Sequence, residues 1–154
     1  MLRSILLFGL ITLQMFAMAM LPTELSDSGI IPKPVSVIPA TGIFTLTEKS
    51  AIIVPDKSVE LMQIGQYLVD KLNPATGFEM LVKSSKGVQS AGNIYLSLSP
   101  DDEQLGDEGY QLTINSDVVN LIANKPACLF NGIQTIRQLF PARIEMASKQ
   151  QCPW

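Results

Sequence analysis

The sequence has 154 residues, enough for one domain with a buried core, and 47% of them are hydrophobic, an ordinary share for a globular protein. Charged residues make up 16%, give a formal net charge of −3 and form no lysine or arginine cluster, which argues against nucleic-acid binding because phosphate neutralisation needs concentrated positive charge. There is no histidine, so histidine-based acid–base catalysis and zinc sites that need imidazole are excluded.

Residues 1–19 have the pattern of a targeting segment. Arg3 gives a positive start, residues 5–16 are mostly apolar, and residues 17–19 form a small-x-small cleavage pattern. A membrane anchor or a buried helix are the alternatives, but the apolar run is shorter than the ~20 residues that a spanning helix needs. We therefore expect a signal peptide removed after Ala19, export to the periplasm or the outside of the cell, and no membrane contact after cleavage.

A proline-containing linker, residues 20–34, is expected next. Two short extended pieces follow, residues 35–38 and 43–46, with Pro39 and Gly42 in the turn between them. The prolines make the first piece an edge strand at best, because proline donates no hydrogen bond to a sheet. Residues 51–54 are apolar and predict a short buried strand.

The first helix is expected to begin at Asp56 or Ser58, either of which can cap it, with Glu60 in the first turn. Residues 73–77 end it. Its apolar stripe consists of Leu61, Ile64, Gly65, Leu68 and Leu72. The segments expected after it are a strand at 78–82, a polar loop at 83–92, a strand at 93–99 and an acidic loop at 100–106.

A β-hairpin that runs into a helix is the clearest pattern in the chain. Tyr110, Leu112 and Ile114 alternate with polar residues, the period of a half-buried strand. Residues 115–117 are turn-forming, and a more apolar strand follows at Val118–Ala123. The period then becomes helical, with the stripe Leu129, Ile133, Ile136 and Phe140.

The bounds of this second helix follow from its terminal residues. Asn124 is a candidate cap, Pro126 is tolerated in the first turn, and Pro141 ends the helix. Gly132 costs about 1 kcal/mol relative to alanine inside a helix, so we expect it to serve close packing on the sheet. Together the elements predict a two-layer α+β domain, with two helices on one face of a mixed, mainly antiparallel sheet.

Short motifs in this region also match a known family. They are Glu108-Gly109-Tyr110, Ala123-Asn124-Lys125-Pro126-Ala127, Leu129-Phe130, Gly132-Ile133-Gln134-Thr135 and Gln138-Leu139, preceded by Ile31-Pro32-Lys33-Pro34-Val35. In this order they resemble the N-terminal domain of family 20 glycoside hydrolases, the β-N-acetylhexosaminidases. One departure is Cys128, where the family pattern usually has glycine.

The resemblance implies the division of the chain. Residues 35–141 would be the hexosaminidase-like N-terminal α/β domain, and residues 142–154 a truncated connector towards a catalytic (β/α)₈ barrel. A barrel takes about 250 residues, so the chain contains none of it. The implied parent activity is hydrolysis of terminal N-acetyl-hexosamine residues by a substrate-assisted retaining mechanism. The chain alone is predicted to be inactive, as an accessory domain or fragment.

Asp107 and Glu108 form an adjacent pair that imitates the family's catalytic Asp-Glu motif. A working general acid needs burial, a raised pKa and a sugar pocket lined with aromatic residues. This pair instead lies in a polar loop, and it precedes Tyr110 as in the family's own N-terminal domain. We interpret it as a solvated loop and strand start and assign no catalytic, cofactor-binding or metal-ligating residue.

Weaker candidates remain open. The acidic set Asp101, Asp102, Glu103, Asp107 and Glu108 could collect Ca²⁺, although its spacing does not fit an EF-hand loop. Cys128 and Cys152 could form a disulfide after export, or Cys128 could simply pack as a small hydrophobic residue. No cofactor is expected.

Three functions remain open. The first is the accessory domain, whose partner would be the barrel and, through it, N-acetyl-hexosamine glycans; it predicts an exposed apolar patch for docking. The second is a free-standing module that binds carbohydrate or protein, for which Phe78, Tyr95 and Tyr110 are the candidate aromatics. The third is a small enzyme that uses Asp107 and Glu108.

Overall fold

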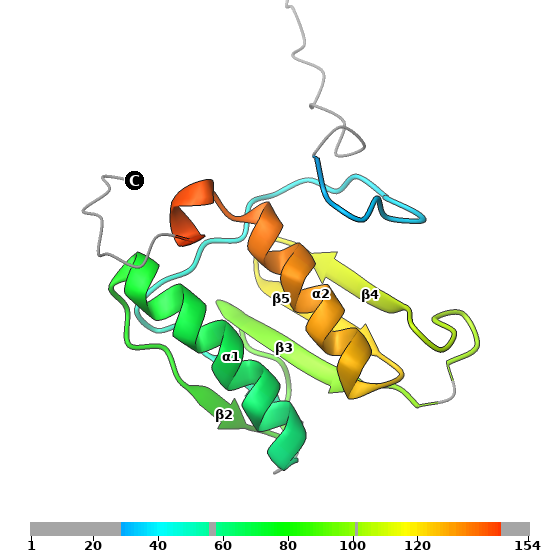
Figure 1. The fold of residues 1–154 in the computed structure, drawn as a ribbon. Helices are drawn as coiled ribbons and strands as arrows, with labels where there is room; N and C mark the ends of the chain where they lie inside the picture. The colour runs from blue at the N-terminus through cyan, green and yellow to red at the C-terminus, as the bar shows by residue number, and fades with distance from the viewer. Residues whose placement is uncertain (1–28, 56–57, 101, 146–154) are drawn as a thin grey trace, which may run out of the picture.

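Figure 1 shows a sheet with two helices on one of its faces, in a computed structural model that describes residues 29–55, 58–100 and 102–145. The elements are β1 (Ile52–Val54), α1 (Val59–Thr76), β2 (Val82–Ser84), β3 (Asn93–Leu98), β4 (Tyr110–Ile114), β5 (Val118–Ala123), α2 (Pro126–Leu139) and the 3₁₀ helix η2 (Ala142–Glu145). The predicted two-layer α+β fold is confirmed. Within the described ranges no helix is both long and apolar enough to span a membrane. The expected signal peptide lies outside those ranges.

The five strands lie in the order β2-β1-β3-β5-β4. β1 pairs in parallel with β2 and β3, β3 pairs in parallel with β5, and β4 and β5 form an antiparallel hairpin. The sheet is therefore mixed, as predicted, but the prediction that it is mainly antiparallel is wrong. For β1 and β2 the physical reason is that the connection between them contains α1, an 18-residue helix, because such a crossover allows two neighbouring strands to run parallel.

The core fills the space between the sheet and the two helices. Ile94 and Leu96 of β3 are fully buried and lie beside Val119 and Leu121 of β5. Alternate residues of each strand thus point towards the helices, as the period of two predicted. The helices contribute Leu61, Leu68, Val69, Leu72, Leu129, Ile133 and Ile136.

α1 begins at a predicted cap and ends within the predicted segment 73–77. The Ser58 hydroxyl accepts a hydrogen bond from the Leu61 N–H at 3.4 Å. The helix continues through Pro74 to Thr76, where Gly77 takes a φ of 76°. In this left-handed conformation, which glycine adopts easily, the Gly77 N–H donates to the Asn73 carbonyl at 2.8 Å and closes the helix.

β2 begins at Val82 and not at residue 78. The Asn73 side chain accepts a hydrogen bond from the Met80 N–H at 3.0 Å and donates one to the Met80 carbonyl at 3.1 Å. These bonds occupy the backbone groups that a strand ladder would use at this point. The ladder to β1 starts where the Ile52 N–H donates to the Leu81 carbonyl at 3.1 Å.

The segment before β1 has no strand among its described residues, so the edge strand expected at 35–38 is wrong. Val35 and Ile38 are exposed, since the neighbouring prolines interrupt pairing and no strand lies beside them. Contact with the domain nevertheless starts before residue 35. Ile30 is buried, and the Ile31 backbone exchanges two hydrogen bonds with the Gln138 side chain, at 2.8 and 2.9 Å.

α2 seats closely on the sheet, as Gly132 predicted. A Cβ atom at this position would lie 2.3 Å from Leu121 Cδ1, so a larger residue would push the helix away from β5. Asn124 does not cap the helix: the N-cap is Lys125, which makes no capping side-chain bond. The Asn124 amide instead donates to the Asp102 and Gly106 carbonyls at 2.9 and 2.8 Å, which ties the acidic loop to the start of α2.

Candidate functional site

The Asp107–Glu108 pair lies in an exposed turn of the acidic loop. The Lys125 ammonium contacts Asp107 Oδ1 at 2.6 Å, and the Asp107 side chain remains 88% exposed. The hydrogen bond and the charge of Lys125 hold the pKa of Asp107 below its usual value. A catalytic acid needs a raised pKa, so Asp107 is not suited to that role. With Lys125 it forms a solvated ion pair.

The other acidic residues of the loop do not gather around a common point. The Asp102 carboxylate accepts a hydrogen bond from the Gln104 N–H at 3.0 Å, which stabilises the turn. Throughout residues 29–55, 58–100 and 102–145 no three histidine, cysteine, aspartate or glutamate side chains are arranged to hold a metal ion. Asp101, part of the candidate calcium set, lies outside these ranges.

The three aromatic residues considered for ligand binding do not converge. The Tyr95 hydroxyl accepts a hydrogen bond from the Ser90 N–H at 2.6 Å, and the Tyr110 hydroxyl lies 2.5 Å from Thr135 Oγ1. Phe78 packs against the core after α1. Each ring therefore has a separate structural role.

Cys128 is buried at the start of α2, where its thiol donates to the Asp107 carbonyl at 3.3 Å. It packs as a small hydrophobic residue, with 3% of its surface exposed. Its predicted alternative partner, Cys152, lies outside the described residues, so the disulfide stays a prediction.

A groove between the first halves of α1 and α2 was not predicted. It has a volume of about 370 Å³ and is lined by Glu60, Gln63, Ile64, Tyr67, Pro126, Ala127 and Phe130. The Tyr67 and Phe130 rings lie side by side in this lining, with centroids 4.9 Å apart and planes tilted by 50°. Phe130 is a large apolar side chain that remains 40% exposed. The groove is thus an apolar recess with a polar rim at Glu60 and Gln63.

One sequence signal could have pointed to this groove. Tyr67 and Phe130 are large aromatic residues that do not belong to the core-facing stripes of their helices. An aromatic side chain off the stripe, on each of two helices that lie side by side, predicts a second apolar face.

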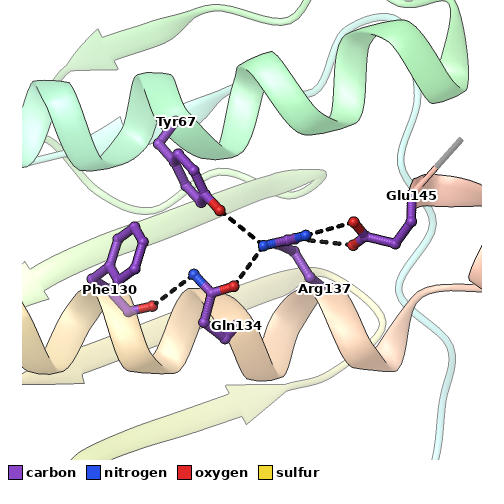
Figure 2. A network of polar contacts seen from close by, with 5 residues as sticks. All are labelled: Tyr67, Phe130, Gln134, Arg137 and Glu145. Carbon is purple, nitrogen blue, oxygen red and sulfur yellow. Dashed lines mark hydrogen bonds and ion pairs between the residues drawn. The ribbon is translucent and has the colours of Figure 1, made fainter. Parts of the chain in front are cut away.

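A polar network continues from the groove along the same helical layer (Figure 2). Arg137 Nη1 donates to the Tyr67 hydroxyl at 2.9 Å and to Gln134 Oε1 at 2.5 Å. On its other side the guanidinium binds both carboxylate oxygens of Glu145, through Nε at 2.9 Å and Nη2 at 2.5 Å. The network therefore joins α1, α2 and η2.

Comparison with known proteins gives a consistent set of relatives. The sequence profile described as "Glycosyl hydrolase family 20, domain 2" matches residues 27–151. A β-hexosaminidase of Porphyromonas gingivalis is 30% identical over 130 residues, which cover 82% of this chain and 16% of that protein. A β-N-acetylhexosaminidase of Cellulomonas fimi is 30% identical over 112 residues, which cover 73% of this chain and 22% of that protein.

Solved structures agree with these relatives. A family 20 β-N-acetylhexosaminidase from Streptomyces coelicolor superposes with a TM-score of 0.71 at 42% identity, over 81% of this chain and 24% of that chain. An N-acetyl-β-hexosaminidase from Streptomyces plicatus, solved in complex with Thio-NAglucal, superposes with a TM-score of 0.72 at 39% identity, over 88% of this chain and 25% of that chain. The chain thus spans a quarter or less of the length of these relatives.

Proposed function

The chain belongs to glycosyl hydrolase family 20 as its domain 2, a non-catalytic domain, and we propose that it serves as the accessory domain of a β-N-acetylhexosaminidase. In this proposal the helical layer packs against a catalytic (β/α)₈ barrel. The barrel hydrolyses terminal N-acetyl-hexosamine residues of glycans by the substrate-assisted retaining route of this family. The chain itself binds the barrel and not the sugar.

The observation that carries the proposal is the open groove between α1 and α2. A helix of a two-layer domain needs only its sheet-facing stripe to be apolar. Here Tyr67 and Phe130, which lie outside the predicted stripes, add apolar surface beside Ile64 between the two helices. Exposed apolar surface with a polar rim is typical of protein interaction sites.

The polar groups of the described residues support a binding role over a catalytic one. The adjacent Asp107 and Glu108 are exposed, and the pKa of Asp107 is shifted downwards by Lys125. Substrate-assisted hydrolysis needs a carboxylic acid that stays protonated beside the sugar, in a pocket that excludes water. That acid would come from the barrel.

A turnover assay tests whether the catalytic activity lies outside residues 20–154. The DNA downstream of the Trp154 codon is read first, in all three frames, and the longer product is made if a barrel with its own Asp-Glu pair follows. We expect the longer protein to release the chromophore from a chromogenic N-acetylglucosaminide. We expect purified residues 20–154 to release none. Turnover by residues 20–154, lost on Asp107→Asn, would contradict the proposal and favour a small enzyme.

We also propose that the chain is exported, on the basis of the positive start, the apolar run and the small-x-small pattern of residues 1–19. The test is N-terminal sequencing of the protein recovered outside the cytoplasm. Cleavage after Ala19 would give a first residue of Met20. Recovery of a chain that still starts at Met1 would contradict the proposal.

A further inference from the structure

We propose that Arg137 is a positioning residue that fixes the direction in which the chain leaves this domain. It does so by holding η2 against the two helices through Glu145 on one side and Tyr67 on the other. The inference rests on the proposed function, in which the segment after Leu139 leads to the catalytic domain.

The guanidinium is placed to bind three elements at once. Its Nε and Nη2 atoms bind the two oxygens of Glu145 in η2, and its Nη1 atom binds the Tyr67 hydroxyl of α1 and Gln134 of α2. The Arg137 side chain is only 17% exposed, so water competes weakly for these bonds. A lysine at this position could not replace it, because an ammonium group has no planar fork for a two-point contact with a carboxylate.

η2 needs such an anchor because its other anchors leave its direction free. It has four residues, and so short a 3₁₀ helix has little stability of its own. Ile144 is 7% exposed and belongs to the core cluster, which keeps η2 close to the domain. Apolar packing is non-directional, whereas a two-point hydrogen-bonded contact sets an angle. Arg137 therefore supplies the orientation that Ile144 does not.

One residue of the network, Tyr67, also lines the groove. Tyr67 receives the bond from Arg137 and packs its ring against Phe130. Gln134 accepts from Arg137 and donates to the Phe130 carbonyl at 3.4 Å. Figure 2 shows this line of contacts running from Phe130 to Glu145. The anchor of η2 and the lining of the groove thus share one side chain, Tyr67.

Charge makes the contact sensitive to acid. The hydrogen bond from Arg137 holds the pKa of Glu145 below its usual value, burial opposes this shift, and Lys71 of α1 adds to it. Tyr67 of α1 is the other titratable group of the network. Because the folded-state pKa is depressed, the ion pair is intact above the ordinary pKa of a glutamate and is lost as the pH falls through the folded-state value.

The test measures the mobility of η2 in the ¹⁵N-labelled chain. Arg137→Lys and Glu145→Gln are compared with Lys125→Gln and Asp107→Asn, which break the exposed ion pair at the other end of α2. In the first two variants we expect the Ile144 amide to exchange about tenfold faster, the factor that corresponds to the loss of one charged hydrogen bond. Amides of β3 and β5 should keep their exchange rates, and the two control variants should match the wild type.

A pH series separates positioning from general stability. The heteronuclear NOE of the Glu145 amide should fall as the wild-type chain is acidified through the Glu145 pKa, and Glu145→Gln should give a low value with no such step. Equal exchange at Ile144 in all four variants would overturn the proposal, and so would a matching acceleration in β3 and β5. These measurements need no barrel, so their failure leaves the accessory role standing, and the absence of a barrel gene leaves them unaffected.

Discussion

The two ends of α2 each carry an ion pair to a neighbouring segment, and the pairs differ in everything except distance. At the start, Lys125 and Asp107 are 2.6 Å apart, with 56% and 88% of their side chains exposed. At the end, Arg137 and Glu145 are 2.5 Å apart, with 17% and 47% exposed. The first pair makes one contact in water, and the second belongs to a network that joins three elements. Surroundings and connectivity, and not the separation of charges, therefore decide what an ion pair contributes.

The largest expected effect comes from Gly132, between the two ends, because it sets how deeply the whole helix seats. Gly132→Ala would place a Cβ atom 2.3 Å from Leu121 Cδ1, so that the fully buried Leu121 side chain or α2 itself must shift. We expect a loss of about 1–3 kcal/mol in the free energy of unfolding, measured by urea denaturation. The matched control is Gly87→Ala, where the nearest atom is Ser85 Oγ at 3.5 Å. Equal denaturation midpoints for the two variants would contradict the close seating of α2.

Arg137→Met and Lys125→Met compare the two ends directly. Methionine keeps most of the side-chain volume and removes the charge in both cases. We expect Arg137→Met to lose about 1–2 kcal/mol, because it leaves the Tyr67 hydroxyl and Glu145 without their shared donor. Lys125→Met should leave the denaturation midpoint unchanged, since its partner is solvated. The difference between the ends would be refuted by equal losses.

Tyr110→Phe gives a neutral hydrogen bond for comparison, on the sheet side of the same helix. The Tyr110 hydroxyl lies 2.5 Å from Thr135 Oγ1, and Thr135 is 6% exposed. Removal of the phenol hydroxyl leaves a buried polar group unpaired, at a cost of about 1 kcal/mol. The double variant Tyr110→Phe with Thr135→Val should recover part of this loss in the same denaturation assay. A double variant that is less stable by the sum of both changes would show that the bond is not what stabilises the pair.

The smallest expected effect is the loss of stability when acid breaks the Arg137–Glu145 pair at the end of α2. The pKa of Glu145 is lowered in the fold, so its contribution to stability is present above the ordinary glutamate pKa and disappears as the pH falls through the lower folded value. Wild type and Glu145→Gln should differ in denaturation midpoint at about pH 6, and this difference should shrink at a lower pH, as the pH falls through the folded-state pKa of Glu145. An undiminished difference at the lower pH would mean that the negative charge of Glu145 is not involved.

The sequence predicted some elements well because their signals are local. The alternation in β4 and the apolar stripe of α2 depend on neighbouring residues, and both elements form where expected. The parallel pairing of β1 and β2 was missed although the length of α1 between them indicates a crossover. Asn124 was wrongly assigned as a cap. Its actual partners, the Asp102 and Gly106 carbonyls, lie in a loop far from it in sequence, and no local pattern indicates them.

The candidate site was less predictable, for a related reason. Asp107 and Glu108 attract attention because they are adjacent, yet adjacency says nothing about burial. In the Arg137 network, Arg137 bonds to Tyr67, 70 positions away in the sequence, and this geometry depends on how α1 and α2 pack. No local pattern contains that information, whereas the aromatic residues Tyr67 and Phe130, which lie off the apolar stripes of their helices, did carry a signal for the groove.

Urea unfolding of two variants of the longer protein tests most directly whether the helical layer docks on the barrel. Phe130→Lys puts a charge in the lining of the groove. Val88→Lys puts a charge outside the groove, at a side chain that is 98% exposed. In residues 20–154 alone, Val88→Lys should unfold at the wild-type urea concentration, and Phe130→Lys should lose only the ~0.5–1.5 kcal/mol of the contact with the Tyr67 ring. In the longer protein, Phe130→Lys should unfold this domain at a lower urea concentration than the rest, while Val88→Lys keeps a single transition. Identical behaviour of the two variants in the longer protein would contradict docking through the helical face.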